Sequence, residues 1–318
     1  MSEQHPTSPP PDATIVVTTR NRKDELGRTL ESCLSQQGNI EVLVIDDASD
    51  DGTSTLVREQ FPGVRLERNE VSRGLIAARN QAAGLARGRI IFSIDDDAVF
   101  TSEDTVERVL REFDHPRVGA VAMPHIHVTD SPDVGTRAPD DRRIYACSSY
   151  VGTAHALRRD LFLALGGYHA EFVRQGEESD LCLRLMNAGY IVRLGLTPPI
   201  HHFPSKIRNL KRQYYFGARN SLLHVWINVP MPLMPLHAAK MTLGWLVNAV
   251  RLRSPGAVLT GLAAGYVSMA RYARLRKPVR QRVYLAALRL SRAKAVPLDD
   301  LLPDLPEPLP LPDGGHAS

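Results

Sequence analysis

Short apolar runs and amphipathic stretches alternate along the first part of the chain. Residues 13–19 (ATIVVTT), 40–45 (IEVLVI) and 89–94 (RIIFSI) are rich in β-branched residues, which is typical of buried strands. Residues 24–37 repeat apolar side chains at the spacing of one helical face. Further strands are expected at residues 64–67, 118–123, 150–156 and 191–194, and further helices at 74–86, 102–113, 160–165 and 181–188. This alternation predicts an α/β fold with a mostly parallel central sheet and helices on both faces.

From about residue 207 the pattern changes to longer helical segments. Helices are expected over residues 206–226, 235–253, 257–275 and 279–294. Residues 254–270 are uncharged but contain three glycines, and they fall short of the ~20 apolar residues of a transmembrane helix. We therefore divide the chain into a disordered lead-in (1–12), an α/β domain (13–226), a basic helical segment (227–296) and a disordered tail (297–318).

Composition places the chain among ordinary globular proteins, with 43% hydrophobic and 23% charged residues. The polar, proline-rich start (MSEQHPTSPPPDA) lacks the apolar stretch of a signal peptide. Cys33, Cys147 and Cys182 are widely spaced and odd in number, which indicates neither a disulfide framework nor a zinc site. A reducing, cytoplasmic location is expected.

Charge is distributed unevenly. Residues 1–180 contain 20 Lys/Arg and 30 Asp/Glu, whereas residues 181–298 contain 19 Lys/Arg and no acidic residue. Five acidic residues follow in 299–318. A basic segment of this length favours an anionic partner, which could be phospholipid, nucleic acid or a phosphorylated acceptor.

Carboxylates directly follow two of the predicted strands. In IIFSIDDDAVF the strand ends at Asp95, Asp96 and Asp97, and the strand of residues 40–45 ends at Asp46 and Asp47. Ligands of open α/β sheets bind at the carboxyl ends of the strands. Three adjacent carboxylates repel one another unless a cation or hydrogen-bond donors compensate. An acidic, solvated turn is the simpler alternative.

Five motifs in the same order resemble the family 2 glycosyltransferases, which use nucleotide sugars and have the GT-A fold. They are IVVTTRNR (15–22), VLVIDDASDDGT (42–53), RGLIAARNQA (73–82), FSIDDDAVF (92–100) and GGYHAEFVRQGEESDLCLRLMNAGY (166–190). The resemblance covers about residues 13–226. With its basic C-terminal segment, the layout is most similar to the rhamnosyltransferase-like members that build bacterial surface polysaccharides.

The resemblance implies a donor site at the strand ends. Asp47 would accept a hydrogen bond from the nucleoside base, with Thr18 and Arg20 beside it, although helix capping by the 46–51 turn is an alternative for the aspartates. Gly74 and Asn80 would lie at the nucleotide, while Arg79 is a weaker candidate, since Arg79 and Asn80 could equally be a surface pair. Asp97 matches the DxD element as the leading ligand of Mg²⁺ or Mn²⁺. The remaining assignments are Asp95 to ribose or metal and Asp96 to the sugar.

The resemblance also suggests a catalytic base at a helix start. GEESD (176–180) contains Glu178, which we assign as the base, with Glu177 supporting it. The family commonly has Asp at the position of Glu178. Negative charges that only stabilise the helix N-terminus are the alternative. Asp180 is expected to pair with Arg184 one turn later.

Two adjacent histidines follow the strand of residues 191–194, and His201 and His202 are expected in a loop. Neighbouring side chains on a strand end point in opposite directions, so at most one is a metal ligand, and His202 is chosen. Lys206, Arg208, Lys211 and Arg212 could contact diphosphate or lipid phosphate.

Together these features predict a metal-dependent, inverting glycosyltransferase that transfers a sugar from a nucleotide-diphosphate donor to a lipid-linked or glycan hydroxyl. We expect peripheral attachment at the cytoplasmic membrane face, with Trp226, Trp245 and Tyr266 as anchors, unless the helices form a cap or dimer interface. The alternatives are a nucleotidyltransferase, which would carry a glycine-rich loop after the first strand, and a non-catalytic scaffold. Aromatic residues amount to only 6%, so no nucleic-acid partner is expected. The oligomeric state is left open.

Overall fold

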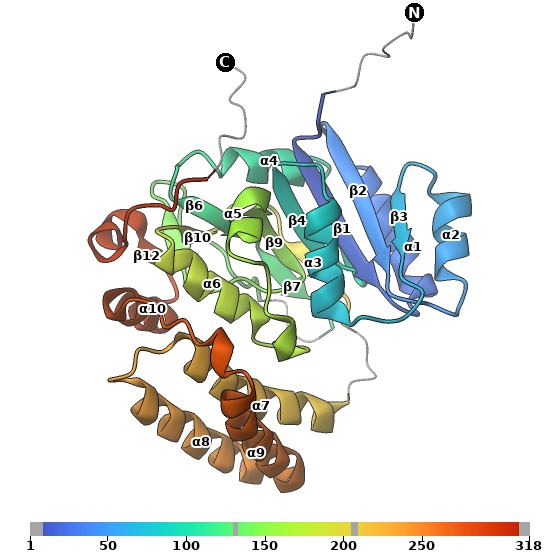
Figure 1. Cartoon of the computed structure of the whole chain (residues 1–318). Coiled ribbons are helices and arrows are strands. Elements are labelled where there is room, and N and C mark those ends of the chain that lie inside the picture. The colour runs from blue at the N-terminus through green and yellow to red at the C-terminus, as the bar shows by residue number, and fades with distance from the viewer. Residues whose placement is uncertain (1–8, 130–132, 205–208, 312–318) are drawn as a thin grey trace, which may run out of the picture.

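The computed structural model describes residues 9–129, 133–204 and 209–311. Within these residues one sheet has nine strands, in the order β12-β8-β10-β6-β9-β4-β1-β2-β3 (Figure 1). The strands are β1 (Ala13–Thr19), β2 (Ile40–Asp46), β3 (Arg65–Arg68), β4 (Ile90–Asp95), β6 (Val118–Ala122), β8 (Tyr145–Cys147), β9 (Ala154–Arg158), β10 (Ile191–Leu194) and β12 (Val296–Pro297). The predicted α/β architecture with a central sheet is confirmed.

Helices cover both faces of this sheet, as the alternation of side chains along β1 requires. They are α1 (Lys23–Leu34), α2 (Thr53–Gln60), α3 (Leu75–Leu85), α4 (Thr105–Arg111), α5 (Arg159–Ala164) and α6 (Glu177–Asn187), with a short 3₁₀ helix at Ala170–Phe172. Ile15 and Val17 share a buried cluster with side chains of α1, α2 and α4. Val16, between them, belongs to a second cluster with α3, α5 and α6. The β-branched run therefore fills two cores.

The strands that carry the acidic motifs run parallel and end at one edge. β1 pairs with β2 and with β4, and the register places Thr19 beside Asp46 and Thr18 beside Asp95. β9 then runs antiparallel between β4 and β6. It begins at Ala154, so the strand predicted for 150–156 is displaced towards the C-terminus. The residues before it form a turn at the end of β4, where the Asp95 amide donates to Thr153 Oγ1.

A second, three-stranded sheet lies at the same edge. Its order is β5-β11-β7, with β5 at Ala98–Val99, β11 at Ile200–His202 and β7 at His125–His127. The expectation that His201 and His202 lie in a loop is wrong, because both belong to β11. β11 pairs with β5, which directly follows the acidic motif, so His202 lies opposite Ala98. This pairing brings a residue from far along the sequence to the end of β4.

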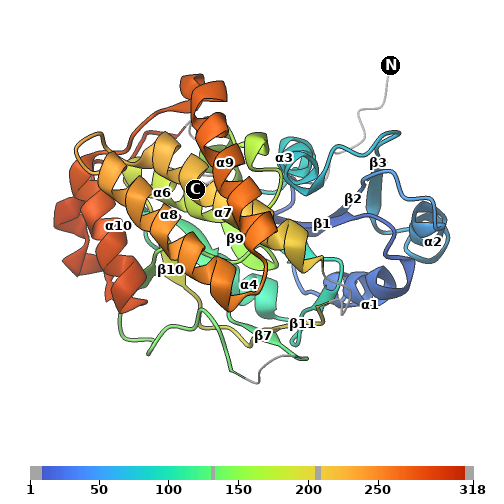
Figure 2. The same ribbon diagram turned by 90° about the horizontal axis from the view of Figure 1, so that it is seen from below.

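The C-terminal part is helical, as predicted. Its helices are α7 (Leu210–Asn228), α8 (Met234–Arg251), α9 (Pro255–Arg271) and α10 (Gln281–Ala293), with a 3₁₀ turn at Ala273–Leu275. α7 packs against α8 and α9, while α10 packs against α6 and β8. Seen from below, α8 and α9 form the layer farthest from the sheet (Figure 2). The boundary expected at residue 226 falls inside α7.

Glycines allow α9 to approach α7 closely. A Cβ on Gly261 would lie 2.4 Å from the carbonyl oxygen of Tyr215, and one on Gly265 would lie 2.8 Å from Cδ1 of Leu222. Two of the glycines in the uncharged segment therefore serve helix packing. Among the described residues, no helix combines the length and the apolarity that crossing a membrane requires.

The two tryptophans expected as membrane anchors contact residues of the helical segment. Trp245 Nε1 donates to Ser221 Oγ of α7 at 3.0 Å, and the guanidinium of Arg276 lies 4.7 Å from the centre of the Trp226 ring. Tyr266 is exposed, as an anchor would be.

The expectation of a disordered tail from residue 297 is wrong for its first part. β12 pairs with β8, and two 3₁₀ turns follow at Leu298–Asp300 and Leu302–Asp304. Leu298 and Leu301 are buried. Residues 312–318, and residues 1–8 of the expected lead-in, lie outside the described residues.

Candidate functional site

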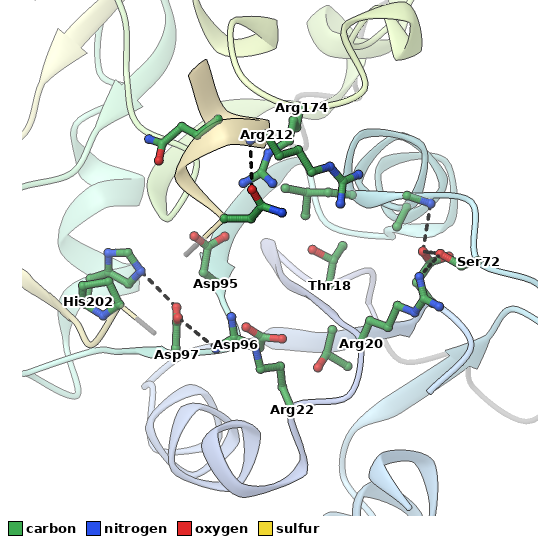
Figure 3. A pocket seen from close by; sticks show the side chains of 18 residues that line it. Thr18, Arg20, Arg22, Ser72, Asp95, Asp96, Asp97, Arg174, His202 and Arg212 are labelled. Atoms are coloured by element: carbon green, nitrogen blue, oxygen red, sulfur yellow. Dashed lines mark hydrogen bonds and ion pairs between the residues drawn. The ribbon is translucent and has the colours of Figure 1, made fainter. Parts of the chain in front are cut away.

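A cavity of about 640 Å³ opens where β1, β2 and β4 end (Figure 3). The N-terminal turn of α7, the loop before α3 and β11 close it from other sides. It is lined by Thr18, Thr19, Arg20, Arg22, Asp47, Ser72, Gly74, Leu75, Ala78, Asp95, Asp96, Asp97, Arg174, His202, Pro204, Asn209, Arg212 and Gln213. Most of the predicted site residues therefore share one cavity.

Three side chains in this cavity form a set of metal-ligand type. One ligand atom from each of Asp95, Asp97 and His202 lies within 4.8 Å of the other two. His202 Nε2 is 3.0 Å from Asp97 Oδ1, and Arg22 Nη1 is 3.3 Å from Asp97 Oδ2. The choice of His202 over His201 agrees with this geometry, since His202 lines the cavity. His202 Nδ1 lies 2.9 Å from His127 Nδ1 of β7, which fixes the orientation of the ring.

Asp96 and Asp97 have different environments. Burial raises the pKa of Asp97, but the hydrogen bond with His202 and the charges of His202 and Arg22 outweigh it, so its pKa lies below the ordinary value. Burial raises the pKa of Asp96 to about 7, against the hydrogen bond from Thr19. Asp97 is therefore an anion at neutral pH, whereas Asp96 is close to its titration midpoint.

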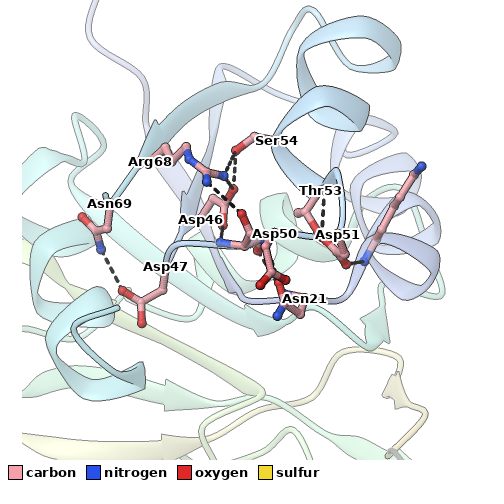
Figure 4. Close-up of polar contacts among 11 residues, drawn as sticks. Asn21, Asp46, Asp47, Asp50, Asp51, Thr53, Ser54, Arg68 and Asn69 are labelled. Atoms are coloured by element: carbon pink, nitrogen blue, oxygen red, sulfur yellow. Dashed lines mark hydrogen bonds and ion pairs between the residues drawn. The ribbon is translucent and has the colours of Figure 1, made fainter. Parts of the chain in front are cut away.

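The neighbouring pair Asp46 and Asp47 divides into two roles (Figure 4). Asp46 is fully buried, and its carboxylate accepts from the Ser49 amide at 2.8 Å, from Arg68 Nη1 at 2.9 Å and from Ser54 Oγ. It holds the turn that leads into α2 but does not cap this helix, whose N-cap residue is Gly52. Asp47 points away from this turn and lines the cavity.

Asp47 organises the loop before α3. Its oxygens accept from Asn69 Nδ2, Ser72 Oγ and the amides of Arg73 and Gly74, at 2.7–2.9 Å. Burial alone would raise the pKa of this carboxyl group, but the four donors lower it below the ordinary value. Gly74 has a φ of +86°, which favours glycine at this turn.

Thr18, Arg20 and Gly74 line the cavity as predicted, but Asn80 does not. Asn80 Nδ2 donates to the Tyr168 carbonyl oxygen at 2.8 Å, and its Oδ1 accepts from the Tyr168 amide at 2.9 Å. Both ends of its amide thus tie α3 to the loop after α5. Asn80 follows the cavity-lining Ala78 by two residues and so lies on a different face of α3, away from the cavity.

Arg79 is the residue that the sequence interpretation undervalued. It is only 6% exposed, and its Nη2 lies 2.8 Å from Asp95 Oδ1. Nη1 lies 3.5 Å from an oxygen of both Glu177 and Glu178. Burial lowers the pKa of Arg79, but the surrounding carboxylates outweigh this and raise it. The alanine-rich sequence of α3 gave the relevant signal, since small side chains leave room for a buried arginine.

Glu177 and Glu178 lie behind Asp95 rather than among the cavity-lining residues. Glu177 is 2% exposed, whereas the Glu178 side chain is 19% exposed. Burial, followed by the charge of Glu178, raises the pKa of Glu177 to about 7. Asp180, by contrast, forms the predicted pair with Arg184 at 2.8 Å, and its other oxygen accepts from Asn228 of α7. It joins α6 to the helical segment.

Several cavity-lining cations were not predicted. Arg22 and Arg174 come from loops whose positions depend on tertiary packing, whereas Arg20 and Arg212 had been considered. Arg174 and Arg212 face the cavity together, and burial, followed by the charge of Arg212, lowers the pKa of Arg174. Lys206 and Arg208 lie outside the described residues. The pairing of two arginines across from the carboxylates indicates a site for a polyanion.

Part of the chain matches a known protein family. Residues 14–166 match the family model for "Glycosyl transferase family 2". These residues belong to family 2 of the glycosyltransferases. They contain the cavity walls from β1, β2, α3 and β4, while Arg174, His202 and Arg212 lie beyond the matched region.

Two curated bacterial relatives match shorter stretches of this chain. Succinoglycan biosynthesis protein ExoO of Rhizobium meliloti is 45% identical over 98 residues, which are 30% of this chain and 26% of ExoO. The Escherichia coli protein WfaP, named as a UDP-Glc:alpha-D-GlcNAc-diphosphoundecaprenol beta-1,3-glucosyltransferase, is 35% identical over 85 residues, which are 26% of this chain and 34% of WfaP. The chain thus spans about a quarter to a third of the length of these relatives.

The fold is similar to that of solved structures. The mannosyltransferase PcManGT from Pyrobaculum calidifontis, solved in complex with GDP-Man and Mn²⁺, has a TM-score of 0.54 and 23% identity. The similarity covers 92% of this chain and 90% of that one. The architecture is thus the GT-A fold that the sequence motifs implied.

Proposed function

We propose that this chain transfers a sugar from a nucleotide-diphosphate donor to a hydroxyl group of a second substrate. The observation that carries the proposal is the single cavity that joins the strand-edge groups around Asp47 to the Asp95–Asp97–His202 set. Membership of residues 14–166 in family 2 supports sugar transfer. The relative named for succinoglycan biosynthesis supports a role in building polysaccharide.

The Asp95–Asp97–His202 set fits a divalent ion. Carboxylate oxygens suit Mg²⁺ and Mn²⁺, and an imidazole nitrogen is more compatible with Mn²⁺. Asp97 pairs with His202 and Arg22, and these contacts favour its negatively charged form. When bound, the ion would neutralise charge on the departing nucleotide diphosphate. Mn²⁺ is bound in the structure of PcManGT, which shares the fold.

The remaining cavity residues suit a nucleotide diphosphate. Thr18, Arg20 and Gly74 surround Asp47 at the end that would hold the nucleoside. Arg174 and Arg212 stand across from the carboxylates, where they would bind phosphate oxygens. Asp96 would contact the sugar.

We assign Glu178 as the base that removes the proton from the acceptor hydroxyl. Its partial exposure gives it access that Glu177 lacks. The hydroxyl oxygen then attacks the anomeric carbon opposite the diphosphate, the bond from that carbon to the diphosphate breaks, and the configuration inverts. This single displacement follows from the family resemblance.

The acceptor is proposed to be lipid-linked or a growing glycan, and the protein is proposed to work as a peripheral protein at the cytoplasmic face of the membrane. The name of WfaP, which includes a diphosphoundecaprenol acceptor, supports a lipid-linked substrate. The basic segment of residues 181–298 supports a negatively charged surface nearby.

A donor panel tests this function. We expect one of the UDP-, dTDP- or GDP-sugars to release nucleoside diphosphate in the presence of Mn²⁺ or Mg²⁺ and to stop doing so in EDTA. Asp97→Ala should lower kcat by at least ~100-fold, because it removes a ligand and the charge that holds the ion. Asp50→Ala, an exposed acidic residue on the turn before α2, is the matched control and should keep full activity.

Two results would contradict the proposal. Turnover that persists in EDTA, or in Asp97→Ala, removes the metal assignment. Release of sugar 1-phosphate instead of nucleoside diphosphate indicates nucleotidyl transfer and removes the glycosyl-transfer assignment.

A further inference from the structure

The outer side of α8 carries a stripe of exposed aliphatic side chains. Leu236, Leu243 and Val250 are 70%, 64% and 79% exposed, and Val247 is also exposed. Their spacing of seven, four and three residues places them on one face of the helix. The opposite face is buried through Ala238 and Ala249. The stripe therefore lies on the solvent-exposed side of α8 and not on the face that packs against the rest of the protein.

α9 extends this apolar face. Leu259, Tyr266 and Val267 are exposed, whereas Val258 and Leu262 face inwards. Thr242 of α8 and Tyr266 of α9 lie side by side, with their hydroxyl oxygens 2.8 Å apart. We call the exposed residues Leu236, Leu243, Val247, Val250, Leu259 and Val267 the α8–α9 face. Figure 2 looks onto the two helices that carry it.

An apolar surface of this kind usually marks an interaction site. Its setting indicates the partner. Lys240 lies within the α8 stripe, and Arg251, Arg253, Arg271 and Arg274 lie at the ends of the two helices. No acidic residue occurs anywhere in residues 181–298. A second copy of the chain would bring the same positive charge to the interface, so charge complementarity favours an anionic occupant.

We propose that the α8–α9 face docks on an anionic phospholipid surface. The aliphatic side chains enter the boundary between headgroups and acyl chains, while the surrounding lysine and arginines contact headgroup phosphates. Helices that lie in the plane of the membrane need no spanning segment, which agrees with the absence of a spanning helix among the described residues.

The position of α7 connects this face to the cavity. α7 packs against both α8 and α9, and Arg212 and Gln213 in its first turn line the cavity. Docking therefore places the cavity wall one helix layer from the lipid surface. This step rests on the proposed function, because a lipid-linked acceptor in that surface would then reach the cavity without leaving the membrane.

Vesicle sedimentation with the full chain tests the docking. We expect the protein to sediment with vesicles that contain phosphatidylglycerol, and to remain in solution with phosphatidylcholine alone. The variant Leu243→Glu/Val250→Glu should lower partitioning by at least ~10-fold, because it removes apolar contact and adds negative charge. The control Leu34→Glu/Leu163→Glu changes two exposed leucines on α1 and α5 by the same chemistry and should bind as the unaltered protein does.

Unchanged binding of the α8 variant would overturn the proposal, as would equal binding to both kinds of vesicle. A dimer in sedimentation velocity that the α8 variant dissociates, without vesicle binding by the unaltered protein, would assign the face to a second copy instead. Donor turnover, measured without vesicles, separates the two proposals. Vesicle binding without turnover of any donor would support the docking and contradict the proposed function. Turnover without vesicle binding would support the function and contradict the docking.

Discussion

At the scale of single residues, the site is organised by the buried guanidinium of Arg79. It contacts Asp95 on one side and both glutamates on the other, so it links the metal-type set to the proposed base. The positive charge of Arg79 offsets part of the negative charge of these three carboxylates, which would otherwise repel one another in a poorly solvated region. The same arrangement distinguishes the two glutamates. Glu177, with its pKa raised to about 7 and Oε2 without a hydrogen-bond partner among the described residues, binds a proton for part of the time near neutral pH.

This difference predicts unequal effects of two matched substitutions. Glu178→Gln should lower kcat for transfer by at least ~100-fold, because it removes the group that accepts the acceptor proton. Nucleotide affinity should be unchanged, because Glu178 does not line the cavity. Glu177→Gln should lower kcat much less, since that side chain already binds a proton for part of the time near pH 7.

The measurements are steady-state transfer rates and calorimetric titration with the nucleotide diphosphate. Equal loss in the two variants would show that the glutamates act as a unit. Normal turnover in Glu178→Gln would move the base elsewhere.

At the scale of elements, β9 shows how one strand serves the core and the site together. Ala154 and Ala156 face one cluster, while His155 faces the other with Leu157. His155 is 1% exposed, stacks on Tyr150 at 4.0 Å, and its Nε2 lies 3.2 Å from the Tyr168 hydroxyl. Burial, followed by the charge of Arg79, lowers its pKa from 6.5 to about 3. The histidine is thus a neutral support behind Arg79.

A pH dependence of stability follows from His155. The unfolded chain binds a proton at this residue below pH 6.5, whereas the folded chain does so only below about pH 3. The unfolding free energy should therefore have its full value above pH 6.5. It should fall as the pH decreases from 6.5 to about 3, by up to roughly 4–5 kcal/mol from this group. Urea unfolding across the window measures the slope. His155→Gln should flatten it, whereas His115→Gln, a half-exposed histidine before β6, should not.

An identical slope in the protein and in His155→Gln would show that other groups account for acid destabilisation. The comparison uses slopes rather than absolute stabilities, because the glutamine substitution also disturbs the stack on Tyr150.

At the scale of the whole molecule, sequence periodicity was sufficient for the α/β alternation and for the strand ends, because both depend on local pattern. It placed Thr18, Asp47 and Asp95 correctly, since parallel strands meet at one edge. It failed where tertiary pairing decides the position. His202 was predicted at the site, but its strand β11 was predicted as a loop because it is too short to show periodicity. Asn80 turns away from the cavity and binds Tyr168. Arg174 reaches the cavity from a loop whose path no local pattern specifies.

The C-terminal residues give another case, because their composition suggested disorder. Leu298 and Leu301 are buried, β12 pairs with β8, and the Tyr190 hydroxyl donates to the Leu309 carbonyl oxygen at 2.7 Å. Arg117 donates to the carbonyl oxygen of Pro306 as well. The leucines of this stretch are buried and its carbonyl groups accept hydrogen bonds from the domain, and composition alone does not distinguish such a segment from a flexible tail.

Removal of this segment should therefore destabilise the whole molecule. Truncation after residue 295 exposes the sites of Leu298, Leu301 and Leu305, each of which contributes about 1.5–3 kcal/mol when buried. We expect the unfolding free energy in urea to fall by at least roughly 4 kcal/mol, with the unfolding transition at lower urea concentration. Truncation after residue 311 leaves these contacts in place and is the control.

If both truncated proteins unfold at the same urea concentration as the full chain, the packed segment contributes nothing to stability. If only the protein truncated after residue 295 is destabilised, residues 296–311 are part of the folded unit. They then hold β8 in the sheet, and through β8 also β10 and β6.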